Sequence, residues 1–211
     1  EVVAAYDINS LKVGKDLSEA IFAEPNNTMK FCDVPKTGVT VQPGVINDGV
    51  GKFVKDIINT SPDSDNFEDS LRESGAEILI NLLPVGSDEA VKYYAQAAIN
   101  SNVGFINCIP VFIARDEEWY QKFKDASVPL IGDDIKSQVG ATIVHRALAQ
   151  LFSDRGVKLE NTYQLNVGGN MDFLNMLEED RLETKRTSKT SSVTSVANKG
   201  TGISADNVRI G

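Results

Sequence analysis

Most of the side chains that could do chemistry in this 211-residue chain lie between residues 132 and 189. The stretch opens with a pair of aspartates, continues with a Gly-Gly-Asn turn that leads to Asp172, and closes on Lys185 and Lys189, four residues apart. Lysines supply movable positive charges that bind a phosphate and stabilise developing negative charge. A crowded or desolvated lysine can also transfer protons, because its pKa shifts. These residue types predict a phosphosugar site, and the elements around them predict a nicotinamide cofactor beside it.

Composition limits the partners of this site. Lys and Arg number 21 against 30 Asp and Glu, so the net charge of -9 disfavours binding to nucleic acid or to an anionic membrane. No apolar run approaches the roughly 20 residues of a membrane span. Two distant cysteines and one histidine make a disulfide framework or a zinc site improbable, which fits a reducing, cytoplasmic location. Local lysines must therefore reverse the field wherever an anionic substrate binds.

Both ends of the chain look like strands of a larger fold. Residues 2–6 form a short apolar run that ends in Asp7, and residues 208–211 are strand-like. We therefore expect a piece of a longer protein. An acidic residue after an interior strand is typical of the second strand of a dinucleotide fold, where it binds the adenosine ribose, but an aspartate here is also a common turn or cap residue.

Strands and helices alternate from residue 2 to residue 152, which predicts a doubly wound α/β sheet. The clearest strands are 76–83, 104–109 and 128–131, and the clearest helices are 88–100 and 116–126. We expect residues 1–160 to form a Rossmann-type domain without its first strand and Gly-rich loop, and residues 161–211 to begin an α+β domain.

Several polar residues at helix starts have two interpretations. Asp16, in an expected helix over 12–23, caps that helix or faces the adenosine. Ser87 is a good N-cap for the helix over 88–100, on which Tyr94 is a core residue more readily than a ligand. Cofactors bind at such strand-to-helix turns when the sheet is parallel.

The longest helical pattern runs over 135–152 and places Lys136 and Ser137 in a first turn that would attract anions. Ordinary capping by an aspartate is the alternative. His145, on the same pattern, reads as a satisfied core residue. A further helix is expected over 172–183. By composition residues 185–199 form a solvated flexible loop, although a loop that orders on a phosphorylated ligand would look the same.

Five motifs now resemble a known family, the bacterial and archaeal myo-inositol-1-phosphate synthases (inositol-3-phosphate synthases). They are the segments KVGKDLSEAIFAEPNNT at 12–28, LPVGSDEA at 83–90, GDDIKSQVGAT at 132–142, QLNVGGNMDFLNM at 164–176 and SKT at 188–190. The resemblance covers essentially the whole chain, and the motifs at 132 and 164 are long and specific.

The resemblance implies an NAD-dependent, isomerising cyclisation of glucose 6-phosphate to myo-inositol 3-phosphate. In that family the sugar is transiently oxidised at C5, enolised, closed by an intramolecular aldol step and reduced again. No net redox change occurs, so such an enzyme is an isomerase. A Rossmann-type domain, a second α+β domain and a homotetramer are also implied.

The resemblance further assigns roles to individual residues. Lys189 would transfer a proton or stabilise an oxyanion, and Lys185 would lie near the nicotinamide and the substrate. Asp172 would keep a lysine charged and bind the sugar or the nicotinamide. The remaining cofactor contacts that the resemblance implies are Asp16, Ser74, Tyr94, Asp134 and Ser137. Asp7 is added as a cofactor contact from its place after a strand.

Two alternatives stay open. Another NAD-dependent oxidoreductase of similar fold, such as a homoserine dehydrogenase-like enzyme, would release NADH on turnover. A non-catalytic NAD-binding module would be indifferent to the loss of Lys189. A divalent or a monovalent cation would be compatible with a phosphate beside carboxylates, but no ligand spacing is diagnostic and no metal site is assigned.

Overall fold

The structure, a computed structural model, describes residues 1–26, 28–62, 64, 66–136, 138–178, 183–197 and 203–210, with backbone alone at 183–188 and 197. Helices alternate with short strands, and every strand pair in this described part is parallel. The predicted α/β class with parallel strands is confirmed. The strands form three small sheets, ordered β1-β2, β3-β4-β5 and β6-β7.

The N-terminal part contains the first of these sheets and two helices. Ala5 pairs with Val41 and Asp7 with Pro43, so the two strands run in register. The elements are β1 (Ala5–Asp7), α1 (Leu17–Ala20), β2 (Val41–Pro43) and α2 (Phe67–Glu73).

The three-stranded sheet holds the main core. On one face Leu79, Phe105 and Leu130 stand in register and pack into an apolar cluster with α2 and α3. Apolar side chains are expected here, because a parallel sheet normally has both of its faces buried. The elements are β3 (Ile78–Asn81), α3 (Asp88–Ser101), β4 (Gly104–Asn107), α4 (Glu117–Ala126) and β5 (Leu130–Ile131).

The remaining elements build a second, elongated lobe. Helix α5 packs against α7 around Ala149, Val193 and Val196, beside the third sheet. The elements are α5 (Ala141–Asp154), β6 (Thr162–Gln164), α6 (Met171–Asn175), α7 (Glu183–Ala197), the 3-10 turn η2 (Ala205–Asn207) and β7 (Val208–Ile210).

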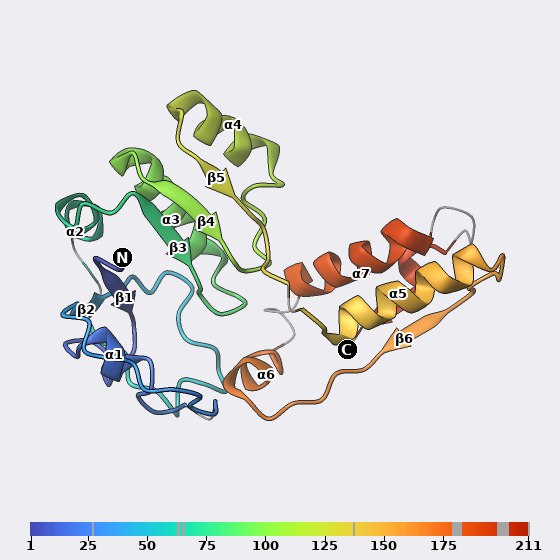
Figure 1. The fold of residues 1–211 in the computed structure, drawn as a ribbon, viewed down its shortest axis with the longest axis horizontal. Coiled ribbons are helices and arrows are strands. Elements are labelled where there is room, and N and C mark those ends of the chain that lie inside the picture. The colour runs from blue at the N-terminus through green and yellow to red at the C-terminus, as the bar shows by residue number, and fades with distance from the viewer. Residues whose placement is uncertain are drawn as a thin grey trace.

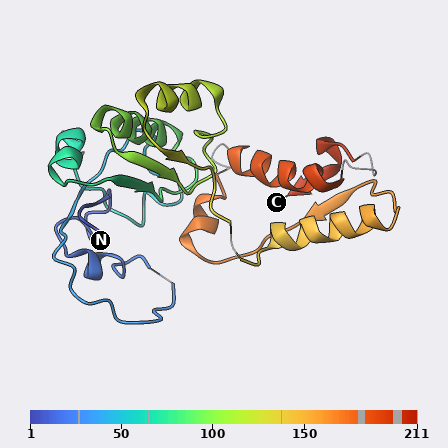
Figure 2. The ribbon, with the colours of Figure 1, turned by 45° about the horizontal axis from the view of Figure 1, so that its top comes forward.

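Both ribbon views show the two lobes side by side, joined at a narrow waist (Figures 1 and 2). The first lobe carries β1 to β5, and the second carries α5, β6, α7 and β7. Helix α6 lies near the waist, at the end of a long extended segment after β6 (Figure 1). Because α5 packs with α7 and β6, the second lobe includes residues before 161.

Three predicted helices are wrong at their bounds. The helix expected over 135–152 begins at Ala141, after Gly140 as its N-cap, so Lys136 does not lie in a first helical turn. The reason is that Ile135 N still donates to Cys108 O at 3.0 Å, which keeps the chain extended beside the end of β4. The helix expected over 12–23 shortens to α1, and the one expected over 172–183 stops at Asn175.

The composition of residues 185–199 gave a wrong structure as well. As far as Ala197 the segment is helical and not a loop, because α7 runs from Glu183 to Ala197; residues 198 and 199 lie outside the described residues. The helix depends on packing, since Val193 is 0% exposed against the apolar side of α5. The strand expected over 208–211 is confirmed as β7, whereas the one over 2–6 shortens to β1.

Candidate active site

The carboxyl edge of the three-stranded sheet is built from buried amides that the sequence did not single out. Asn81 ends β3 and Asn107 ends β4, and both are buried. Asn81 Nδ2 donates to Asn107 Oδ1 at 2.8 Å, while Asn107 Nδ2 donates to Val111 O at 2.6 Å and to Asp133 Oδ1 at 2.8 Å. Buried polar groups bonded in this way fix the directions in which the loops leave the sheet.

Asp133 extends this network to the loop before α4. Its carboxylate accepts backbone N–H bonds from Ile113, Ala114 and Arg115, each at 3.1 Å. The first aspartate of the pair is thus a structural anchor. The second, Asp134, has φ of 69° and forms an ion pair with Lys136 beside that anchored loop.

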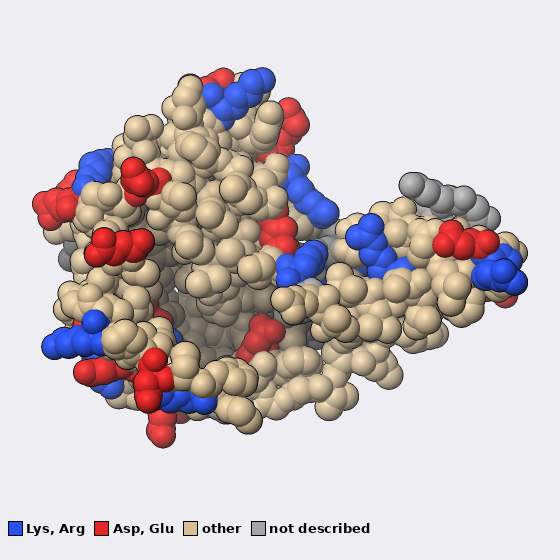
Figure 3. Space-filling view, viewed as in Figure 1, with Lys and Arg blue, Asp and Glu red and all other residues tan. Residues whose placement is uncertain are grey.

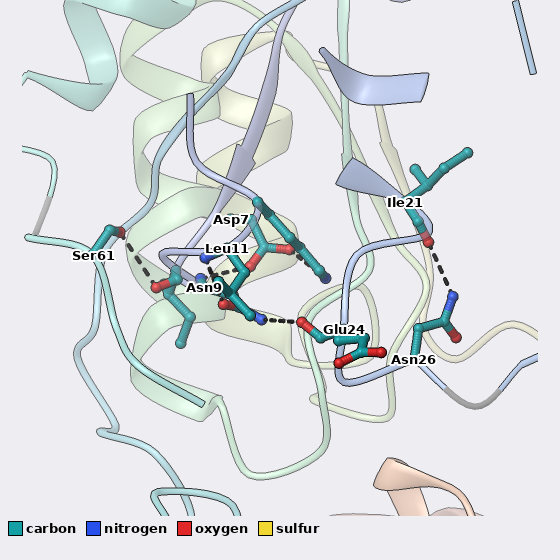
Figure 4. A network of polar contacts seen from close by, with 9 residues as sticks. Asp7, Asn9, Leu11, Ile21, Glu24, Asn26 and Ser61 are labelled. Carbon is teal, nitrogen blue, oxygen red and sulfur yellow. Dashed lines mark hydrogen bonds and ion pairs between the residues drawn. The ribbon is translucent and has the colours of Figure 1, made fainter. Parts of the chain in front are cut away.

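Asp7 lies at the carboxyl end of β1, where the dinucleotide interpretation requires an acid. Asn9 N donates to its Oδ1 and Lys12 Nζ to its Oδ2, both at 2.8 Å (Figure 4). Asn9 itself is buried and accepts from Leu11 N, which fixes the turn after the strand. The Asp7 side chain is still 30% exposed.

Three other predicted cofactor residues make contacts that serve the fold. Asp16 caps α1 and accepts from Ser18, Thr37 and Gly38, at 2.7 to 3.1 Å. The Ser74 hydroxyl donates to Leu71 O at the end of α2. Tyr94 is 7% exposed, stacks edge-on against Phe67, and its hydroxyl accepts from Val45 N.

The hydrogen bonds from Ser18, followed by those from Thr37, hold the pKa of the Asp16 carboxyl well below its usual range. Each of these donors favours the charged form.

Helix α6 brings two of the sequence motifs together. Asn175 is buried, and its Nδ2 donates to Val85 O at 2.7 Å, in the turn that follows β3. Glu178 accepts from Lys52 N at 2.8 Å on the same side of the molecule. Asp172, in the first turn of α6, is therefore carried to the carboxyl edge of the sheet from a segment ninety residues later in the chain.

The two predicted lysines share a helix. Lys185 and Lys189 both lie on α7, and a spacing of four puts them one turn apart on one face. Lys189 is half-buried, whereas the side chain of Lys185 and the whole of Ser137 lie outside the described residues. The end of α7 that holds them points toward the waist (Figures 1 and 2). Figure 3 shows basic and acidic side chains gathered together at that waist.

The residues at the end of β1 fit the ribose of a dinucleotide. Each carboxylate oxygen of Asp7 has received one hydrogen bond, and each can accept a second from a ribose hydroxyl. The N-terminus of α3 is different: Asp48 accepts from Glu89 N and Ala90 N, both at 2.8 Å, and so fills the place of an anion there. No group of three or more metal-ligating side chains occurs among the described residues. In the same part of the chain, no helix has the length and apolar character needed to cross a bilayer.

Comparisons with known proteins show which proteins this chain is similar to. Residues 140–210 match the family model for myo-inositol-1-phosphate synthase. Inositol-3-phosphate synthase of Mycolicibacterium smegmatis is 60% identical over 92% of this chain and 53% of its own length. The enzymes of Mycobacterium tuberculosis and Corynebacterium glutamicum are 58% and 53% identical, over 53% and 54% of their lengths. The chain thus spans about half the length of these relatives.

Solved structures resemble the fold over the whole chain. A crystal structure of Ari2 gives a TM-score of 0.71 at 38% identity, covering 99% of this chain and 54% of the other. A myo-inositol-1-phosphate synthase-related protein from Thermotoga maritima gives a TM-score of 0.70 at 24% identity, over 100% of this chain and 60% of the other, which shows the fold alone.

Proposed function

We propose that this chain, related by sequence to the bacterial inositol-3-phosphate synthases over 92% of its length, is part of an enzyme that cyclises glucose 6-phosphate to myo-inositol 3-phosphate. The activity is proposed for the full-length protein, because the chain spans 53% of that relative. A cytoplasmic location is part of the proposal.

One observation carries the proposal beyond sequence identity. The buried bond from Asn175 to Val85 O seats the motif that bears Asp172 on the turn of the LPVGSDEA motif. Ligands of open parallel sheets bind at this carboxyl edge. Two motifs that are far apart in the sequence therefore face the place where a cofactor and its substrate would meet.

The proposed cofactor is NAD, which would take a hydride from the sugar and return it. Asp7 would accept hydrogen bonds from the ribose hydroxyls, with Lys12 and Asn9 holding its carboxylate in place. Asp134 and Ser137 would line the cofactor cleft. Asp16, Ser74 and Tyr94, engaged in the fold, would support the cleft through the elements they stabilise.

The lysines of α7 would serve the sugar phosphate. Lys189 would stabilise the developing oxyanion or transfer a proton, and Lys185 would lie one turn earlier, near the nicotinamide. Asp172 would keep a neighbouring lysine charged. The half-buried position of Lys189 supports this role, because ammonium groups act more strongly where water is scarce.

The finer architecture is also proposed. A Rossmann-type doubly wound domain, followed by the start of an α+β domain, is supported by parallel strands throughout the described part. The boundary expected at residue 160 moves to a point before α5, because α5 packs with α7 and β6 in the second lobe. A homotetramer is supported by apolar side chains left exposed on the second lobe, namely Val144, Leu148, Leu151, Tyr163 and Leu165.

The deciding experiment incubates the full-length protein with glucose 6-phosphate and catalytic NAD, and identifies the product by phosphorus NMR. We expect an inositol phosphate without net NADH formation. Accumulation of NADH in step with product would favour an ordinary oxidoreductase. Binding of NAD with no conversion of the sugar would favour a non-catalytic module.

A further inference from the structure

His145, the one histidine of the chain, sits at the start of a directional chain of hydrogen bonds. The ring lies on α5 and is 9% exposed. Its Nδ1 is 3.2 Å from Gln164 Oε1, and its Nε2 is 2.7 Å from Thr162 Oγ1. Both partners belong to β6, so the ring joins the helix to the strand.

The next bond in the chain fixes the tautomer. Gln164 Nε2 donates to Asn166 Oδ1 at 3.0 Å, so the amide of Gln164 turns its carbonyl oxygen toward the ring. A carbonyl oxygen only accepts, so with the Gln164 amide in this orientation Nδ1 carries the hydrogen. In the neutral ring Nε2 is then bare and accepts from the Thr162 hydroxyl.

The series of hydrogen bonds that starts at His145 reaches the candidate site at Asn166. This residue opens the segment that leads through Asn170, the N-cap of α6, to Asp172. Further along, Asn175 anchors the segment to the first lobe through Val85. The segment is thus held at one end by the sheet and at the other by the Gln164 amide.

We propose that His145 is a positioning residue: as the Nδ1–H tautomer it orients Gln164, which holds Asn166 and thereby sets the place of Asp172. The effect on turnover rests on the proposed function. Loss of the bond between Gln164 and Asn166 would release the part of the segment that precedes Asp172, while Asn175 and Glu178 would still hold the part that follows it. Displacement of a group that acts in a reaction by about 1 Å can cost about 10²-fold in rate.

Two substitutions of His145 separate positioning from packing. The amide nitrogen of asparagine is as many bonds from Cβ as Nδ1, so His145→Asn keeps a donor for Gln164. The amide of glutamine reaches the position of Nε2, so His145→Gln keeps the contact with Thr162 and loses the donor. In both variants an amide side chain replaces the ring in the same buried site, so its packing is disturbed. We therefore expect similar losses of thermal stability in the two variants.

In the full-length enzyme we expect His145→Gln to lower kcat by about 10²-fold, with the KM for glucose 6-phosphate nearly unchanged, while His145→Asn retains most of kcat. Equal loss of kcat in the two variants would overturn the proposal. Thr162→Val provides a third comparison, because it removes the bond at Nε2 and leaves the Gln164 bond in place. It should resemble His145→Asn in kcat.

The tautomer gives a readout that needs no turnover. A long-range proton–nitrogen correlation spectrum of the full-length protein, with the ring signals assigned by their loss in the variants, should show protonated Nδ1 and bare Nε2. The opposite tautomer would refute the proposed series of hydrogen bonds from His145 to Asn166, even if the variants fail to fold. If the wild-type protein forms no inositol phosphate, the proposed function fails, and this spectrum still decides whether His145 sets the Gln164 amide.

Discussion

At the scale of single residues, the candidate site divides into groups that meet a ligand and groups that hold the chain. Asp133 is an example of the second kind, because its carboxylate is used by three backbone N–H groups and by Asn107. Asp134 and Asp172 lie close along the chain to such anchors, Asp134 directly after Asp133 and Asp172 three residues before Asn175. Anchored neighbours make a site rigid, which is what a reaction that depends on charge placement needs.

Lys189 carries the strongest residue-level prediction. If the full-length protein has the proposed activity, Lys189→Ala should lower the rate of inositol phosphate formation by at least about 10²-fold, the usual effect of removing one group that stabilises developing charge. NAD affinity, measured by fluorescence titration, should stay near the wild-type value. Lys158→Ala is the control, because Lys158 is exposed and pairs only loosely with Glu160 at 3.4 Å. An unchanged rate in Lys189→Ala would remove this lysine from the mechanism.

Asp16 predicts a pH dependence of stability. Its folded pKa lies below the value near 3.9 of an unfolded aspartate, so its contribution is present above about pH 4 and is lost as the pH falls through the folded pKa. Between about pH 5 and 7 the melting temperature of Asp16→Ala should therefore lie below that of the wild type, because the variant lacks one charged carboxylate. The difference between the two melting temperatures should become smaller below about pH 4. Thermal melts across this range test the claim. Asp33→Ala, at an exposed pair with Lys30, should change little.

At the scale of elements, the cap of α3 comes from an unexpected place. Ser87 occupies the N-cap position, but its side chain makes no capping hydrogen bond. The carboxylate of Asp48, about forty residues earlier in the chain, accepts instead from the backbone N–H groups of Glu89 and Ala90. The crowding of carboxylates has a second effect. Burial, followed by the charge of Asp48, raises the pKa of Asp88 at the start of the helix.

Asp48→Ala should therefore cost about 0.5–2 kcal/mol of unfolding free energy, as the loss of a helix cap does, whereas Ser87→Ala should be nearly neutral. Urea denaturation of the two variants in parallel measures the difference. A larger loss for Ser87→Ala would mean that the local serine, and not the distant aspartate, caps the helix.

The sequence predicts elements well where the signal is local. Helix α4 begins after Asp116, which accepts from Glu118 N and Trp119 N as a cap should, and β4 follows an apolar run. Helix α7 was missed because its sequence is rich in Ser, Thr and Lys. Among its described side chains, Val193 and Val196 are the buried apolar ones that pack with α5. Tertiary packing, which composition does not reveal, decides such a helix.

The same limit applies to the site. Asp7, Asp134 and Asp172 stand out in the sequence because charges after strands or in first turns are conspicuous. Asn81 and Asn107 do not stand out, since an asparagine at a strand end looks like an ordinary turn residue. Only the register of β3 beside β4 brings these two amides within 2.8 Å of each other.

At the scale of the whole molecule, the three-stranded sheet has one covered face and one open face. Ile80, Ile106 and Ile131 stand in register on the face opposite to Phe105, and Ile80 and Ile131 are 55% and 64% exposed. Parallel sheets normally carry cover on both faces. The relatives are about twice as long as this chain, so we expect residues of the full-length protein outside 1–211 to cover this row.

Ile80→Thr tests that expectation in the full-length protein, because threonine keeps the β-branched shape and loses apolar area. If the row is covered, the substitution should cost about 1.5–3 kcal/mol, as for an isoleucine removed from a buried site. Leu79→Thr is the matched comparison on the face that is already packed in this structure, and it should cost a similar amount. Urea unfolding gives both values. A cost within about 0.5 kcal/mol for Ile80→Thr, beside a full cost for Leu79→Thr, would mean that the isoleucine row stays in contact with solvent in the full-length protein.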